Sequence, residues 1–155
     1  MLDQIRALSR EFIGLRFQEY QRYFFKNNPL DHRVAIILGD RGIGKTTTLV
    51  QYLMQYAEGD ALSPKILYIQ ADHILIGSLT LYEIAEEFYK LGGELIAFDE
   101  IHKYSDWSIE LKSIIDTFPR LKIIASGSSA LEIRKGSHDL SRRAIVYQMV
   151  DSMFS

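Results

Sequence analysis

Five short apolar runs recur along the chain, each four to six residues long and bounded by glycine, proline or polar residues. They occupy residues 34–38, 65–70, 94–98, 122–125 and 144–149. Runs of this length and composition predict buried β-strands. The third run is apolar at nearly every position, which is typical of a strand covered on both faces.

Between these runs, apolar residues recur every three or four positions, which predicts amphipathic helices. After the first strand the spacing is carried by Leu49, Val50, Leu53, Met54 and Ala57. Later helices are predicted over 81–88, closed by two glycines, and over 107–118, stopped by a proline.

The chain also begins with a predicted helix, over residues 2–27, with Ile5, Leu8 and Phe12 on its apolar face. Arginines alternate with aromatic residues further along it, at Arg16, Tyr20, Arg22, Tyr23 and Phe24. Such alternation can stack on nucleobases. An amphipathic helix packed on its own domain is the favoured interpretation.

Strands that alternate with helices imply a parallel sheet with right-handed crossovers. The predicted fold class is therefore α/β, a three-layer sandwich with a five-stranded, mainly parallel sheet and an N-terminal helix. We expect one domain over 1–155, with a helical segment at 1–28 and a core at 33–150.

Composition narrows the function classes. The 155 residues carry a net charge of −2, which does not favour nucleic acid or an anionic membrane as a partner. There is no cysteine, which excludes disulfides and thiolate metal sites. No apolar run approaches the length that a membrane-spanning helix needs, and the first thirty residues lack the apolar core of a signal peptide. We expect a soluble cytoplasmic protein with no membrane partner.

The loop after the first strand carries the most specific chemistry. Gly39-x-x-x-x-Gly44-Lys45-Thr46 is the P-loop or Walker A pattern, with a strand before it and a helix after it. Its glycines let backbone N–H groups approach phosphates, Lys45 adds a positive charge, and the Thr46 hydroxyl suits Mg²⁺. The predicted nucleotide-binding residues are Gly39, Asp40, Arg41, Gly42, Ile43, Gly44, Lys45, Thr46 and Thr47.

A second anchor is predicted where the third strand ends, in the pair Asp99-Glu100. Ligands of open α/β sheets bind at the carboxyl ends of the strands. Asp99 is expected to hold Mg²⁺ together with Thr46, the Walker B role. Glu100 is expected to activate water as a general base. His102 completes an Asp-Glu-x-His sequence found in some helicases, but the chain has room for only one such domain.

Two further candidates for catalysis follow the fourth strand. A hydroxyl in the Ser126-Gly127-Ser128-Ser129 segment, Ser126 first among them, could sense the γ-phosphate, although a polar loop with a helix N-cap explains the segment equally well. Arg142 or Arg143 could act as an arginine finger towards a neighbouring subunit. A solvated basic face is the alternative for these arginines.

Several segments together resemble the prokaryotic AAA-type ATPases that usually carry a C-terminal nuclease-like domain of unassigned function. They are 39–48, the Phe-Asp-Glu-Ile-His-Lys-Tyr-x-x-Trp segment at 98–107, 111–112, 126–129 and the Asp-Leu-Ser-Arg-Arg segment at 139–143. The resemblance spans about 33–149 and implies a RecA-like P-loop NTPase core that uses ATP and Mg²⁺. It also implies the roles given above for Lys45, Thr46, Asp99 and Glu100.

The chain departs from the family pattern in two ways. Asp40 stands where the loop often has proline, and the helical lid and C-terminal domain are absent. We therefore expect an N-terminal ATPase domain alone, with weak turnover. Alternatives are a nucleotide-dependent signalling switch and a DNA-associated regulator. A homo-oligomer, and DNA contacted through the missing C-terminal domain, are left open as partners.

Overall fold

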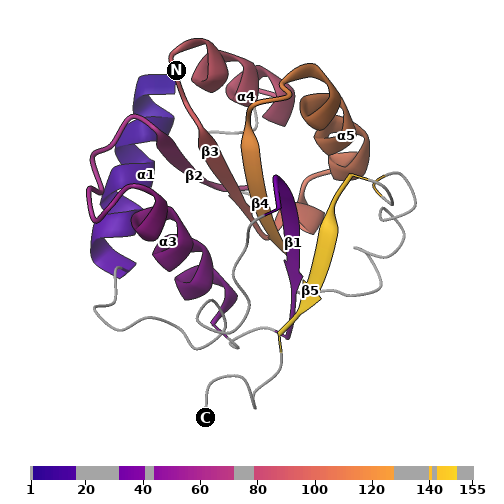
Figure 1. Cartoon of the computed structure of the whole chain (residues 1–155), viewed down its shortest axis with the longest axis horizontal. Helices are drawn as coiled ribbons and strands as arrows, with labels where there is room; N and C mark the ends of the chain where they lie inside the picture. The colour runs from indigo at the N-terminus through magenta and orange to yellow at the C-terminus, as the bar shows by residue number, and fades with distance from the viewer. Residues whose placement is uncertain are drawn as a thin grey trace.

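The protein forms a five-stranded parallel sheet with helices on both faces (Figure 1). The structure is a computed structural model that describes residues 2–16, 32–40, 44–71, 79–127, 140 and 143–149. The strands are β1 (Val34–Leu38), β2 (Ile66–Gln70), β3 (Leu95–Asp99), β4 (Lys122–Gly127) and β5 (Ile145–Gln148). Their order is β2-β3-β4-β1-β5, and every neighbouring pair is parallel. The predicted fold class is confirmed.

Helices complete the two outer layers. The helix α3 (Lys45–Tyr56) covers one face, and α4 (Leu81–Lys90) and α5 (Trp107–Thr117) cover the other (Figure 1). A separate apolar cluster lies on each face of the sheet. All five residues of β1 and of β3 are buried, which explains why their sequences, apart from Asp99, are apolar without alternation. None of the described helices is long and apolar enough to cross a membrane.

The helix α1 (Leu2–Arg16) lies along β2, at one edge of the sheet (Figure 1). The Tyr68 N–H donates to Ser9 Oγ at 2.9 Å, so α1 supplies a partner to the edge strand. The predicted apolar face of this helix was wrong at one position, because Leu8 is 37% exposed. Its buried residues are Leu2, Ile5, Ser9 and Ile13. The predicted continuation over 17–27, with Tyr20, Tyr23 and Phe24, falls outside the described residues.

The helix α4 has well-defined ends. At its start, Thr80 and Glu83 form a capping box in which each side chain accepts from the other's backbone N–H. Its predicted closure at two glycines is confirmed, since Gly92 adopts a positive φ of 91° just after the helix. A Cβ on Gly93 would lie 2.4 Å from the Phe88 ring, so the second glycine is needed for close packing.

At the amino-terminal edge of the sheet, Arg33 holds the end of α5. Its guanidinium donates to the carbonyl groups of Ile115, Phe118 and Leu121. The contacts with Ile115 and Phe118 lie in the last turn of the helix and at its C-cap, where carbonyls lack intrahelical partners. Ligands of open α/β sheets bind at the opposite, carboxyl-terminal edge.

Candidate functional site

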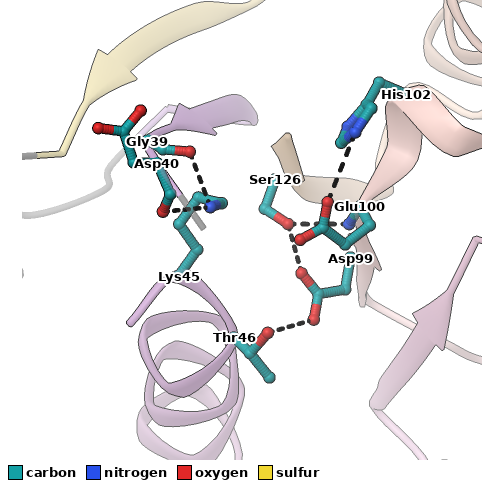
Figure 2. Close-up of polar contacts among 8 residues, drawn as sticks. All are labelled: Gly39, Asp40, Lys45, Thr46, Asp99, Glu100, His102 and Ser126. Carbon is teal, nitrogen blue, oxygen red and sulfur yellow. Dashed lines mark hydrogen bonds and ion pairs between the residues drawn. The ribbon is translucent and has the colours of Figure 1, made fainter. Parts of the chain in front are cut away.

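Most of the predicted site residues that the structure describes meet where β1, β3 and β4 end and α3 begins (Figure 2). Gly44 precedes the helix with φ 97° and ψ 20°, a left-handed conformation that glycine adopts without steric cost. Its carbonyl accepts from both the N–H and the hydroxyl of Thr48, each at 2.9 Å. The start of α3 is thus fixed at Gly44. The predicted loop residues Arg41, Gly42 and Ile43 lie outside the described residues.

Lys45 is buried, with 5% of its surface exposed. Its ammonium donates to the carbonyls of Gly39, at 2.8 Å, and of Asp40, at 3.0 Å (Figure 2). Burial lowers the Lys45 pKa, and the nearby carboxylates of Glu100, Asp99 and Asp40 oppose this without cancelling it. An anion brought next to the ammonium would relieve the cost of its burial.

The Asp99 carboxylate is the centre of the polar cluster and is 2% exposed. Oδ2 accepts from the Thr46 hydroxyl at 2.6 Å and from the Tyr68 hydroxyl. Oδ1 accepts from the Ser126 hydroxyl. The structure thus brings together Thr46 and Asp99, 53 positions apart in the chain (Figure 2). Thr47, the next predicted binding residue, lies half-buried in the first turn of α3.

Glu100 leaves the line of β3. Its φ of 54° and ψ of 46° are left-handed, which is uncommon for a residue with a side chain. Its N–H donates to Ser126 Oγ at 3.0 Å, and its carboxylate points towards His102, with 3.6 Å from Oε2 to His102 Nε2 (Figure 2). Within the described part of the chain, this buried oxygen has no hydrogen-bond partner. A buried carboxylate oxygen in that condition can accept a proton or a hydrogen bond from a water molecule.

Ser126 is fully buried and connects the two carboxylate residues. Its hydroxyl donates to Asp99 and accepts from the Glu100 backbone. Its neighbours Ser128 and Ser129 fall among the residues that the structure does not describe.

Arg143 is not brought to this cluster. It precedes β5, whose register with β1 begins at Ala35 opposite Ile145, so it lies at the amino-terminal edge of the sheet. Its guanidinium forms two hydrogen bonds with Asp116, at 2.8 and 3.2 Å. This bidentate contact holds the pKa of Asp116 below its ordinary value. The side chain of Arg142 is among those not described.

Two residues at the site were not singled out for it from the sequence. In the sequence, Tyr68 reads as one apolar residue of a strand. His102 stands out only as part of an Asp-Glu-x-His sequence, which did not assign it to the site. No pattern along the sequence identifies Tyr68, because its place depends on strand register: Tyr68 pairs with Ala97, two residues before Asp99 on the neighbouring strand. Side chains at alternate positions of a strand share a face, so Tyr68 and Asp99 lie on the same side of the sheet.

The donor set fits Mg²⁺. A carboxylate and a hydroxyl are oxygen ligands of the kind this ion prefers, and it takes few ligands from the protein itself. No group of three or more histidine, aspartate or glutamate side chains that could hold a metal occurs among the described residues. Such a site leaves the remaining ligand positions to water and phosphate.

Comparison with known proteins gives a family match and matches among solved structures. The sequence matches the model of a family described as AAA domain over residues 31–155. A search of proteins with curated function finds no match.

Two of the solved structures that match the chain illustrate the shared fold. One is PCH-2 from C. elegans, with 13% identity and a TM-score of 0.53; the match covers 95% of this chain and 42% of that chain. The other is AMPPCP-bound DnaA from Aquifex aeolicus, with 16% identity and a TM-score of 0.52, covering 97% and 48%. The chain therefore spans less than half the length of either structure. Identities this low indicate the fold alone.

Proposed function

Because the chain belongs to the AAA domain family, whose model it matches over residues 31–155, we propose that it binds ATP with Mg²⁺ and hydrolyses the nucleotide. The observation that supports this most directly is the contact between the Thr46 hydroxyl and the buried Asp99 carboxylate. It lies at the start of a helix whose first residue is a buried lysine. A P-loop ATPase requires this combination of phosphate-binding and metal-binding groups.

Each side chain then has a distinct task. Lys45 and the N–H groups at the start of α3 bind the phosphates. Thr46 and Asp99 hold the Mg²⁺, which supplies charge neutralisation to the phosphate oxygens when it is bound. Glu100 orients a water molecule and takes its proton, as that water forms a bond to the γ-phosphorus and the bond to ADP breaks.

The buried Glu100 oxygen supports this assignment. It belongs to the residue that directly follows Asp99, and within the described residues it has no hydrogen-bond partner, with His102 Nε2 at 3.6 Å. Ser126 contacts both acidic residues, so we assign it the sensor role, in which it relates the position of Asp99 to that of Glu100.

Arg143 cannot serve the site of its own chain from the opposite edge of the sheet. We therefore propose that it acts as an arginine finger on a neighbouring copy in a homo-oligomer. Contact with DNA stays a prediction from the family resemblance.

The test compares ATP turnover and ATP binding in the wild type, Lys45→Ala and Glu100→Gln. Glu87→Gln is the matched control, because Glu87 is an exposed carboxylate on α4. We expect Glu100→Gln to bind ATP and lose turnover by about 10²-fold or more, the usual contribution of a general base. Lys45→Ala should weaken binding itself.

Equal turnover in the wild type and both site variants would contradict the enzymatic proposal. Mg²⁺-dependent ATP binding by a wild type without turnover would instead favour the nucleotide-dependent switch.

A further inference from the structure

A tyrosine from the edge strand contacts the carboxylate at the centre of the site. Tyr68 lies on β2 and donates its hydroxyl to Asp99 Oδ2, on β3. The register pairs Tyr68 with Ala97 and Gln70 with Asp99, so the tyrosine starts two residues short of the carboxylate on the same face. That offset is about 6.6 Å along a strand. A tyrosine is long enough to cover it, whereas a serine or threonine is not.

The Tyr68 ring is itself held by α1. It stacks on Phe12, with ring centroids 4.3 Å apart and planes inclined by 10°. The Tyr68 N–H donates to Ser9 Oγ at 2.9 Å, and the residue is 3% exposed. The helix thereby fixes both the backbone and the ring of Tyr68, and with them the direction of its hydroxyl.

The three hydroxyl donors to Asp99 are not equivalent. Thr46 shares Oδ2 with Tyr68, but it is also a proposed metal ligand and must present a lone pair to the ion. Ser126 donates to the other oxygen and also accepts from the Glu100 backbone. Tyr68 comes from a strand with no proposed ligand, so it can stay on Oδ2 whether or not the ion is bound.

From this geometry we propose that Tyr68 is a positioning residue for the Mg²⁺ ligand Asp99, and that α1 maintains it through the stack with Phe12. The inference rests on the metal-binding role proposed above. A hydrogen bond to a ligating carboxylate fixes its orientation, and loss of such an outer partner typically costs 10- to 100-fold in metal affinity.

The test measures binding of a fluorescent ATP analogue, first in EDTA and then with increasing Mg²⁺. The variant is Tyr68→Phe, which removes the hydroxyl and keeps the ring. The matched control is Tyr56→Phe, since Tyr56 also donates to a carboxylate, Glu94 at 2.8 Å, at the other end of β3.

We expect Tyr68→Phe to raise, by about tenfold, the Mg²⁺ concentration at which the gain in affinity for the analogue is half-maximal. Its affinity for the analogue in EDTA should match that of the wild type. Tyr56→Phe should change neither quantity. Phe12→Leu removes the stacked ring and keeps the Tyr68 hydroxyl. It should weaken the response to Mg²⁺ in an otherwise wild-type chain, but cause no further loss in a chain that already carries Tyr68→Phe.

Three results would overturn the proposal. They are an unchanged Mg²⁺ response in Tyr68→Phe, an equal loss of affinity with and without Mg²⁺, and an effect as large in Tyr56→Phe. The second would mean that the hydroxyl serves only the fold. A wild type that binds the analogue with no gain from Mg²⁺ would instead refute the metal site, and this inference with it.

Discussion

Among single side chains, two tyrosine–carboxylate pairs with the same chemistry lie at opposite ends of β3. Tyr68 contacts Asp99 at the site, and Tyr56 contacts Glu94 at 2.8 Å where the strand begins. Burial, and then the hydrogen bond to Glu94, raise the pKa of Tyr56 to about 12. Of these two pairs, Tyr56 and Glu94 lie away from the proposed ligands. The titration of the Tyr56 hydroxyl can therefore be followed without interference from nucleotide or metal.

The raised pKa of Tyr56 predicts how stability depends on alkaline pH. The folded state holds the phenolic proton more tightly than the unfolded chain, in which a tyrosine titrates near 10. The stabilisation is complete below pH 10 and is lost as the pH rises towards about 12. We expect the free energy of unfolding of the wild type to fall more steeply over this range than that of Tyr56→Phe. Urea denaturation at several pH values measures both slopes, and parallel curves would refute the expectation.

The residues of the site were predictable from sequence to differing degrees. Lys45, Thr46, Asp99 and Glu100 could be selected because each has a fixed place relative to a glycine loop or to the end of an apolar strand. Tyr68 could not, because its part depends on which strands are neighbours and in which register. Periodicity along one segment contains neither fact.

At the level of helices and strands, glycines decide how closely elements pack. Gly93 lies between α4 and β3, where a Cβ would meet the Phe88 ring at 2.4 Å. Gly14 lies within α1, and a Cβ there would meet no other atom within 4 Å. The two glycines therefore make a matched pair, one required by packing and one not.

We expect Gly93→Ala to lower the free energy of unfolding by about 1–3 kcal/mol, because the extra methyl must displace a fully buried ring. Gly14→Ala should raise it by about 0.5–1 kcal/mol, since alanine is the better helix former. Chemical denaturation of the two variants and the wild type gives the three values. A Gly93→Ala protein as stable as the wild type would show that Phe88 can move.

The elements were predictable where burial is uniform and less so where a polar group is buried. All five strands were found from their apolar runs, with ends that match or differ by at most two residues. The face of α1 was misjudged because Ser9, a polar residue, is buried against β2 and satisfied by a backbone N–H. Leu8, which fits an apolar stripe, is exposed instead. Hydrophobicity alone cannot show that a hydrogen bond compensates the burial of a hydroxyl.

Across the whole molecule, the polar cluster and Arg143 occupy opposite edges of the sheet. Glu100 follows the carboxyl end of β3, and Arg143 precedes the amino end of β5. The register of β5 on β1 sets this separation. Arg143 could therefore act as an arginine finger only on a second copy of the chain.

A mixture of two impaired variants tests that arrangement. We expect Arg143→Ala alone to lose turnover by about 10³-fold or more, and Glu100→Gln alone by about 10²-fold or more. Mixed chains should regain turnover, because an intact Glu100 in one copy can meet an intact Arg143 from the other. Asp116→Asn, which breaks the ion pair but keeps the arginine, should retain turnover. A mixture no more active than its parts would exclude the shared site.

At Glu100, the left-handed backbone conformation lowers the stability of the fold, whereas the side chain is proposed to serve activity. A glycine there would remove a conformational cost of about 1 kcal/mol. It would also remove the carboxylate proposed to act on water. Directed evolution that screens only for heat resistance should select glycine at this position and yield a protein that is more stable to heat but inactive. A screen for activity would retain the glutamate despite its conformational cost.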